Sequence, residues 1–280
     1  MTSVFMRFPE GKQKALTLSY DDGTDQDERL IDLMKQYGLK GTFNISSGCY
    51  VKEGTVFKEG QYHRRLTRQQ AIDLYKDSGM EIAVHGLTHP YLDHLPVGMC
   101  TKEVLEDRIN LEEQYGQIVR GMAYPFGTYN DSVVENLKSC GIVYSRTIET
   151  TGKFRLPTDW LRLKATCHHA DPNLMKLAHD FVENDKRKYP ALFYVWGHTF
   201  EFERDDNWEI IEEFVEYIGN REEIWYATNI EIYDYVKAYE QLSFSANGQQ
   251  VYNPTAYTLY FEKDGRLCHV EPNEYKSLNK

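Results

Sequence analysis

Short β-type runs alternate with helical stretches along most of this 280-residue chain, and this alternation restricts its fold more than any other feature. The run Ala15–Tyr20 is apolar and β-branched and stops at Asp-Asp-Gly. The next stretch, Asp25–Tyr37, carries apolar residues at helical spacing and is followed by Gly38. Repeated strand–helix units favour a parallel sheet, and about seven or eight of them in one chain predict a closed barrel.

The alternation continues until residue 240, where the pattern changes. Further strands are expected at 41–46, 81–86, 121–127, 142–148, 160–166, 191–198 and 224–228, and further helices at 67–79, 102–115, 132–139, 173–184, 208–218 and 231–239. Beyond them, alternating runs surround an Asn-Gly and an Asp-Gly pair, which are typical hairpin turns. We therefore expect an α/β barrel over residues 1–240 and a small β-hairpin extension over residues 241–280, packed on the barrel.

The charge and the cysteines restrict the partners and the compartment. The formal net charge is −11 and no basic stripe is visible, so nucleic acid and anionic membranes are poor candidate partners. The N-terminus lacks the apolar core of a secretory signal, and no apolar run approaches the length of a membrane span. The five cysteines lie far apart without a Cys-x-x-Cys pair, as expected of reduced thiols. We expect a cytoplasmic protein and leave its oligomeric state open.

Polar side chains follow several of the expected strands. In a parallel barrel, functional groups collect at the C-terminal ends of the strands, so these side chains are expected to lie close together. They are Asp21 and Asp22, Asn44, His85 with His89, the turn 124–127, and Trp196 with His198. Several of these are the residue types that metal-assisted hydrolysis requires.

Two of these strand ends indicate a possible metal site. Asp21 and Asp22 could form a solvated turn that closes a strand, and His85 and His89 could be two half-exposed loop side chains. The alternative is that Asp22, His85 and His89 hold a divalent cation, for which imidazole and carboxylate are common ligands. Adjacent residues at a strand end point in different directions, which leaves Asp21 free to act as a base. The cation would also offset the repulsion between the two acids.

Five short motifs, in this order, resemble a known family. Tyr-Asp-Asp-Gly, His-Gly-Leu-Thr-His, Tyr-Pro-Phe-Gly, Thr-Asp-Trp and Trp-Gly-His look like the motifs of the polysaccharide deacetylases, the NodB homology domain of carbohydrate esterase family 4. The resemblance extends from Ala15 to Ala238. It implies a distorted parallel (β/α)7-type barrel, and hydrolysis of N- or O-linked acetyl groups on sugars. It also implies a divalent metal, zinc in the first place, with cobalt, nickel or manganese as alternatives.

The first two motifs carry the implied metal site. By resemblance, Asp21 is the general base and Asp22 a metal ligand, and His85 and His89 are the other protein ligands. A glycine follows the first of these histidines where the family usually has Ser or Thr, and Thr88 would fix the loop instead.

The third motif departs from the family pattern. The family usually has an arginine two residues before the proline, where it orients the catalytic aspartate, but this chain has Ala123 there. Arg162 is our candidate to replace it. The N–H of Phe126 would stabilise the tetrahedral oxyanion, with Tyr124 and Pro125 as supporting residues. On its own, this stretch is equally consistent with a Pro-Gly turn.

The last two motifs supply the implied acid and part of a sugar groove. Asp159 would support the site by pairing with Arg162 or by orienting His198, and Trp160 would form one wall of the groove. His198 would be the general acid that protonates the leaving group, beside Trp196, which stands where the family usually has Leu. Taken singly, Trp160 is equally consistent with a core residue, and a core histidine packed near aromatic residues is the preferred interpretation of His198.

Two further clusters have weaker expectations. His63, Arg64 and Arg65 form a basic group in a long loop, for which a solvated surface is the preferred interpretation. Cys167, His168 and His169 could ligate a metal, but adjacent residues rarely converge on one ion, so we expect them to contact the substrate or the side chains that surround the site.

The sequence thus predicts a metal-dependent hydrolase acting on an acetylated carbohydrate. One alternative is a hydrolase of the same superfamily that acts on a small non-acetyl amide, such as a formamide or a ureide. Another is a catalytically silent carbohydrate-binding barrel. The absent arginine of the third motif is the main reason to keep both open.

Overall fold

The computed structural model describes residues 3–183 and 188–279. Its strands are β1 (Val4–Arg7), β2 (Lys14–Asp21), β3 (Gly41–Ile45), β4 (Glu81–Val84), β5 (Gly121–Ala123), β6 (Tyr144–Thr150), β7 (Leu163–Ala165), β8 (Cys167–His168), β9 (Ala191–Gly197), β10 (Ile224–Tyr226), β11 (Ser243–Phe244), β12 (Gln250–Tyr252), β13 (Leu259–Lys263), β14 (Arg266–Val270) and β15 (Tyr275–Ser277). Its helices are α1 (Asp27–Gln36), α2 (Arg68–Tyr75), α3 (Val97–Tyr115), α4 (Asp131–Ser139), α5 (Leu174–Glu183), α6 (Phe200–Arg204), α7 (Glu209–Ile218) and α8 (Asn229–Tyr239). The final residues of the helix expected at 173–184 and of the extension lie outside the described residues.

The strand pairs of the central sheet are parallel, in the order β7-β6-β5-β4-β3-β2-β9-β8, and β10 also pairs with β2. β7 and β8 stand at opposite ends of this order, yet only Thr166 separates them in the chain. One short segment, 163–168, therefore pairs with β6 at its start and with β9 at its end, which closes the barrel. A register shift between β6 and β7 makes the closure irregular. The expected distorted parallel barrel is confirmed.

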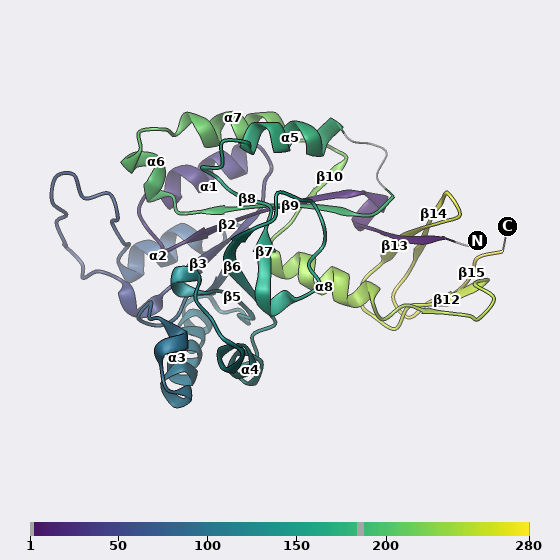
Figure 1. The fold of residues 1–280 in the computed structure, drawn as a ribbon, viewed down its shortest axis with the longest axis horizontal. Coiled ribbons are helices and arrows are strands. Elements are labelled where there is room, and N and C mark those ends of the chain that lie inside the picture. Colours follow the sequence, from purple (N-terminus) through teal and green to yellow (C-terminus); the bar gives the residue numbers. More distant parts are fainter. Residues whose placement is uncertain (1–2, 184–187, 280) are drawn as a thin grey trace.

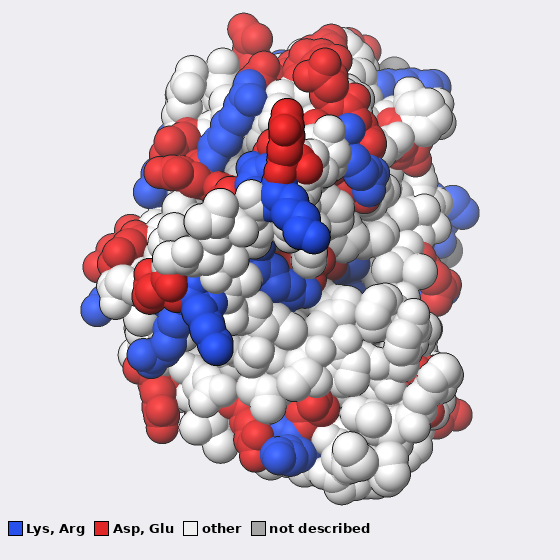
Figure 2. All heavy atoms as spheres, turned by 90° about the vertical axis from the view of Figure 1, so that its left-hand side faces the viewer, with Lys and Arg blue, Asp and Glu red and all other residues white. Residues whose placement is uncertain are grey.

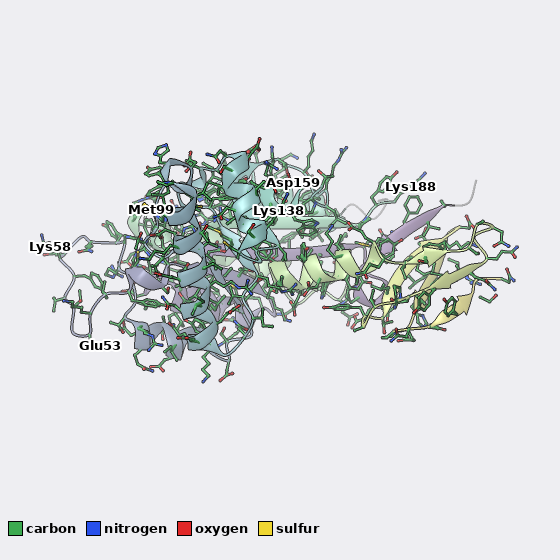
Figure 3. The ribbon with its side chains drawn as sticks, turned by 90° about the horizontal axis from the view of Figure 1, so that it is seen from below. Glu53, Lys58, Met99, Lys138, Asp159 and Lys188 are labelled. Atoms are coloured by element: carbon green, nitrogen blue, oxygen red, sulfur yellow. The ribbon has the colours of Figure 1, made fainter. Side chains whose placement is uncertain are left out.

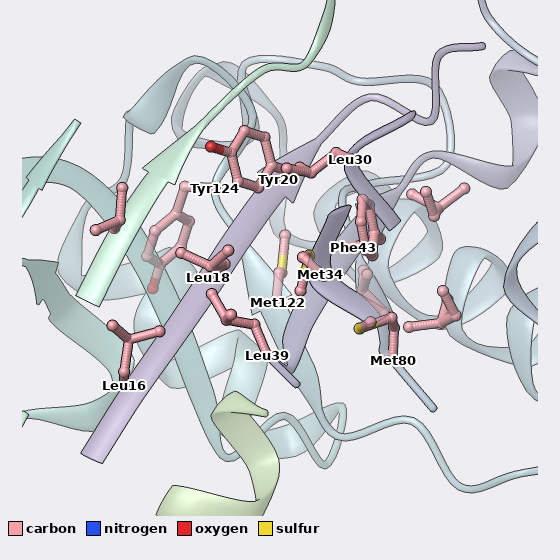
Figure 4. Close-up of a cluster of buried hydrophobic side chains, with 14 of the residues drawn as sticks. Leu16, Leu18, Tyr20, Leu30, Met34, Leu39, Phe43, Met80, Met122 and Tyr124 are labelled. Atoms are coloured by element: carbon pink, nitrogen blue, oxygen red, sulfur yellow. The ribbon is translucent and has the colours of Figure 1, made fainter. Parts of the chain in front are cut away.

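The strand residues alternate between the helices and the barrel interior. In β2, the side chains that face the helices join a buried apolar cluster, part of which is drawn in Figure 4: Leu16, Leu18 and Tyr20. The residues between them face the interior, where the Ser19 hydroxyl accepts a hydrogen bond from Asn44 of β3. The same alternation turns Asp21, the last residue of β2, inward at the end of the barrel.

The helices cover the barrel wall on more than one side. In Figure 1, α1, α5, α6 and α7 lie above the strands, α3 and α4 lie below them, and α2 lies at the left beside β3. Thr67 caps the N-terminus of α2 in a capping box, because its hydroxyl accepts from the Gln70 N–H and the Gln70 side chain accepts from the Thr67 N–H. Among the helices of the described residues, none is long and apolar enough to cross a membrane.

The C-terminal part of the chain forms two small antiparallel sheets at the end of the molecule away from the C-terminus of β2 (Figure 1). The two predicted hairpin regions pair as β11 with β12 and β13 with β14. β1, which we assigned to the barrel, pairs instead with β13, so the first strand belongs to the sheet of the extension. A strand that pairs with a distant segment gives no local signal of its partner. The division into two domains stays a prediction.

Two connections differ from the expected pattern. Residues 160–162, expected to begin a strand, form a short 3₁₀ turn before β7. The long connection from β3 to α2 extends away from the barrel, with Glu53 and Lys58 near its tip (Figure 3), and then returns. Its last residues, 62–66, which we call the strap, run antiparallel along the segment after β2: the Leu66 N–H donates to Gly23 O and the Asp25 N–H to Arg64 O.

Candidate active site

The C-terminal end of β2 places two acidic side chains side by side at one end of the barrel. Asp21 is 3% exposed, and Asp22 is 8% exposed with a φ of 82°, in the left-handed region. This change of backbone direction gives the two adjacent carboxylates different neighbours. Figure 2 shows this end of the molecule, where basic and acidic side chains lie close together around the middle of the face.

Asp21 is held by a buried arginine. Arg146 Nη2 donates to Asp21 Oδ2, and Asn44 Nδ2 donates to Asp21 Oδ1 over 2.8 Å. Arg146 is 1% exposed, and its guanidinium carbon lies 4.4 Å from the centre of the Trp196 ring. Trp196, one of the expected supporting residues, therefore packs against the cation that binds Asp21.

Arg146 supplies the charge for which we had proposed Arg162, so that prediction is wrong. In the parallel pair of β5 and β6, Arg146 of β6 is the register partner of Ala123 of β5, the position where the family usually has arginine. Partners in register face the same side of a sheet. Arg146 therefore reaches Asp21 from β6, the strand next to the one that would carry the family arginine. Burial on its own would raise the pKa of Asp21, but Arg146, followed by two histidines, holds it below its usual value.

Asp22, His85 and His89 meet at the same end of the barrel. One potential ligand atom from each lies within 4.8 Å of the other two. His85 directly follows β4, and Gly86, with a φ of 74°, turns the chain so that the ring centres of His85 and His89 are 4.8 Å apart. Thr88 fixes this loop, as expected, because its N–H and hydroxyl donate to the Glu103 carboxylate on α3.

The chemistry of these three side chains fits a divalent cation. His85 Nδ1 lies 2.8 Å from the carbonyl oxygen of Ala123, which only accepts, so Nδ1 carries the proton and Nε2 presents its lone pair. Burial lowers the pKa of His85, and burial followed by the charge of His85 lowers the pKa of His89 to about 4. Two neutral imidazoles and a carboxylate are a ligand set suited to zinc or a related divalent ion.

The strap contacts Asp22 directly. Arg65 Nη2 donates to Asp22 Oδ1 over 2.7 Å, and His63 Nε2 lies 3.1 Å from Asp22 Oδ2. Arg64 donates to both Glu203 oxygens of α6 and to Asp25. The expectation of a solvated basic surface is therefore wrong for this cluster. The charges of these residues did not reveal their acidic partners, because the contacts form only where the loop turns back toward the end of β2.

His198 lies between Asp21 and a second carboxylate. Its Nε2 is 3.8 Å from Asp21 Oδ2, and its Nδ1 is 3.3 Å from Oε2 of Glu201 in α6. Burial would lower the pKa of His198, but the hydrogen bond with Glu201 and the charges of the two aspartates raise it above its usual value. Our sequence interpretation missed Glu201. The available signal was a carboxylate three residues after the histidine, within a short helix.

Two further histidines contact the same Glu201 oxygen. Oε2 of Glu201 lies 3.2 Å from His168 Nε2 and 3.4 Å from His169 Nε2. Atoms of His168, His198 and Glu201 also lie within 4.8 Å of one another, as in a metal site. However, His168 Nδ1 accepts the Ala170 N–H, so its Nε2 carries the proton and donates to Glu201. These side chains form a hydrogen-bonded cluster behind His198.

The Phe126 turn lies beside His89. Pro125 is buried and begins a 3₁₀ turn, in which Phe126 has a φ of 57°. The Phe126 ring is 46% exposed, stacks on Tyr91 with ring centres 3.9 Å apart, and meets His89 edge-on at 4.4 Å. The turn expected to carry an oxyanion donor is thus next to the three convergent side chains.

Two expected supporting side chains lie in the core. Tyr124 is 1% exposed, belongs to the apolar cluster of Figure 4, and donates its hydroxyl hydrogen to Leu161 O. Trp160 is 8% exposed and packs edge-on against Tyr233 of α8. The prediction that Trp160 forms a wall of a sugar groove is wrong, because an aromatic residue in a core position was mistaken for a surface one.

Asp159 and Arg162 lie at the surface and form an ion pair. Asp159 accepts from the Leu161 N–H and from Arg162 Nη1, and Arg162 also contacts Asp131 of α4. Of the two roles expected for Asp159, pairing with Arg162 is confirmed. Within the described residues no hydrogen bond or ion pair joins Asp159 to His198, whose carboxylate partner is Glu201.

Comparison with known proteins gives a family and a fold. The polysaccharide deacetylase family model matches residues 9–145, and no curated protein has a significant match to the chain. A proposed polysaccharide deacetylase from Mycobacterium smegmatis has a similar structure: 15% identity, coverage of 85% of this chain and 95% of that one, and a TM-score of 0.57.

Two other solved structures extend the comparison. The Xyl-CE4 domain of a multidomain xylanase from the hindgut metagenome of Trinervitermes trinervoides is 14% identical, covers 85% of this chain and 100% of its own, and has a TM-score of 0.53. The Streptococcus pyogenes deacetylase PplD, in complex with acetate, is 23% identical over 47% of this chain with a TM-score of 0.41, and this chain spans about half (55%) of it. The family match covers just under half of the chain, and the solved structures share its barrel, so this chain resembles the polysaccharide deacetylase family and shares its fold.

Proposed function

We propose that this protein is a metal-dependent hydrolase that removes acetyl groups, N- or O-linked, from a carbohydrate. The main support is the convergence of Asp22, His85 and His89 within 4.8 Å, next to Asp21 and His198, which are 3.8 Å apart. The metal would be zinc or, alternatively, cobalt, nickel or manganese. The match of residues 9–145 to the polysaccharide deacetylase family model supports an acetylated carbohydrate as the substrate.

The proposed attack uses Asp21 as the base. A bound divalent ion would polarise the acetyl carbonyl and lower the pKa of a water molecule. Asp21 accepts the proton that this water loses, and its lowered pKa keeps the carboxylate ionised and ready. The Phe126 N–H donates to the carbonyl oxygen as negative charge develops there.

His198 would complete the reaction as the acid. Its Nδ1 is bonded to Glu201, which leaves Nε2, on the side of Asp21, to protonate the leaving group. The raised pKa of His198 favours the protonated ring that this step needs. Because an amine anion is a very poor leaving group, the proton matters most for an N-linked acetyl group. Acetate and the free amine or alcohol then leave.

Acetate release from a panel of acetylated oligosaccharides tests this function. We expect turnover of at least one substrate, loss of that turnover after dialysis against a chelator, and its return when zinc or another divalent ion is added. The metal content of the protein is measured in each state. Full turnover by protein shown to contain no metal would refute the metal dependence.

The alternatives have lost their main support. Ala123 in place of the usual arginine was the only reason to consider a silent carbohydrate binder and, together with the cytosolic character of the sequence, a reason to consider a formamide or ureide substrate. Arg146 now supplies that positive charge. Small amides belong in the same assay panel, and product analysis would identify them as substrates. A cytoplasmic location stays a prediction that cell fractionation would check.

Glu201→Gln should separate two kinds of substrate. The variant removes the charge that favours protonated His198, so we expect kcat on an N-acetyl sugar to fall by about 10²-fold. Hydrolysis of p-nitrophenyl acetate should change little, because its leaving group departs without a proton. Steady-state kinetics on both substrates check this.

The exposed Asp205→Asn, close to Glu201 in the chain, is the matched control and should behave as the unchanged protein on both substrates. Equal losses of Glu201→Gln on the two substrates would mean that Glu201 acts on something other than the leaving group.

A further inference from the structure

The strap is fixed rigidly over the acidic end of β2. Its backbone pairs with residues 23–25 of the segment that follows Asp22. Arg64 binds Asp25 and both oxygens of Glu203 over 2.6–2.8 Å, and Gln26 donates to Tyr62 O and to Glu203. The strap is thereby held between the β2–α1 connection and α6, so its side chains keep defined positions.

Both oxygens of Asp22 are engaged by the strap. Oδ1 accepts from Arg65 over 2.7 Å, and Oδ2 lies 3.1 Å from His63 Nε2. The Arg65 side chain is 15% exposed and that of Asp22 9%, so water screens this pair only partly. An arginine paired so closely satisfies a buried carboxylate without any metal.

Arg65 binds the oxygen of Asp22 that also faces the other ligands. His89 Nε2 lies 3.6 Å from Oδ1, the same oxygen that accepts from Arg65. A cation held by Asp22, His85 and His89 would share this carboxylate with the positively charged guanidinium of Arg65. Two positive charges on one partly buried carboxylate repel each other, and the repulsion is stronger than it would be in water.

We propose that Arg65 competes with the metal for Asp22 and sets the affinity of the site well below what its three ligands alone would give. Arg65 is a positioning residue in this role: it neutralises Asp22 in the metal-free protein and makes the metal exchangeable. The inference rests on the proposed metal site, and it adds a determinant of metal affinity from a loop that carries no family motif.

The sign of the change in metal affinity tests the proposal. We expect Arg65→Gln to bind Zn²⁺ and Co²⁺ about tenfold more tightly than the unchanged protein, because one repelling charge is removed. Dissociation constants are measured on metal-free full-length protein by competition with a chromophoric chelator. An arginine that only orients Asp22 predicts the opposite sign, since loss of such a partner typically weakens metal binding by about 10–100-fold.

Thermal unfolding gives a second measurement that does not depend on activity. Metal-free Arg65→Gln should melt at a lower temperature than the metal-free unchanged protein, because Asp22 has lost its partner. Addition of metal should raise the Tm of the variant by more than it raises that of the unchanged protein, as tighter binding to the folded state requires.

Two further variants show whether charge is the cause. Arg65→Lys keeps the charge and should leave the dissociation constant within about threefold. Arg68→Gln removes a charge from an exposed position three residues away and should leave it unchanged. An Arg65→Gln affinity equal to or weaker than that of the unchanged protein would overturn the proposal. If the unchanged protein and all variants bind no metal, the proposed metal site fails instead.

Discussion

Replacement of Asp21 by Asn is expected to lower kcat by about 10²–10⁴-fold while the protein still binds its metal. The amide keeps the size of the carboxylate but cannot accept a proton from water. Asp22, His85 and His89 are unchanged in this variant, and their ligand atoms converge without help from Asp21. Steady-state kinetics, together with metal analysis of the same sample, check both parts of the expectation.

Stability has to be measured beside activity, because Asp21 is also the partner of Arg146. Loss of its charge leaves a buried guanidinium without a counter-ion, which we expect to lower the melting temperature as well. Assays are therefore run well below the Tm of the variant. The exposed Asp32→Asn on α1 is the matched control. Near-normal turnover by folded, metal-loaded Asp21→Asn would remove Asp21 from the role of base.

The parallel barrel could be predicted because its signals are local. The apolar, β-branched run of β2 and the helical spacing of α1 are patterns of neighbouring residues, and both segments form the expected element. The pairing of β1 with β13 joins residues about 255 positions apart, as in Arg7 with Tyr260, and no local pattern encodes such a partner. The closure of the barrel through residues 163–168 could not be predicted for a related reason. This one segment pairs with two different strands, β6 at its start and β9 at its end.

In the site, too, residues within short motifs could be predicted, whereas their partners from distant parts of the chain could not. The candidate ligands and the candidate acid–base pair could be named from short motifs, since the proposed chemistry requires those residue types. Arg146 and Glu201, which hold Asp21 and His198, could not, because a charge partner can come from any strand or helix that passes nearby. One usable signal remained in β6: Arg146 lies in the middle of a strand that was expected from the sequence, and an arginine that such a strand buries needs a partner.

Arg146→Gln is the second change with a large expected effect. Asp21 would remain buried without its main counter-ion, which typically costs about 3–5 kcal/mol of folding free energy. The pKa of Asp21 would rise, since burial raises it and Arg146 is the largest of the influences that lower it. We therefore expect kcat to fall by about 10²-fold and the Tm to drop. Denaturant unfolding and steady-state kinetics measure the two effects separately.

The register between β5 and β6 offers a decisive companion experiment. Ala123 and Arg146 are partners across this parallel pair, so an arginine at either position starts from the same level of the barrel wall and faces the same side. The double variant Ala123→Arg with Arg146→Ala should recover part of the activity that Arg146→Ala alone loses, whereas the exposed Arg155→Gln should lose none. If the double variant folds, binds metal and is still no more active than Arg146→Ala, the charge beside Asp21 is not what Arg146 contributes, and its role is confined to packing against Trp196.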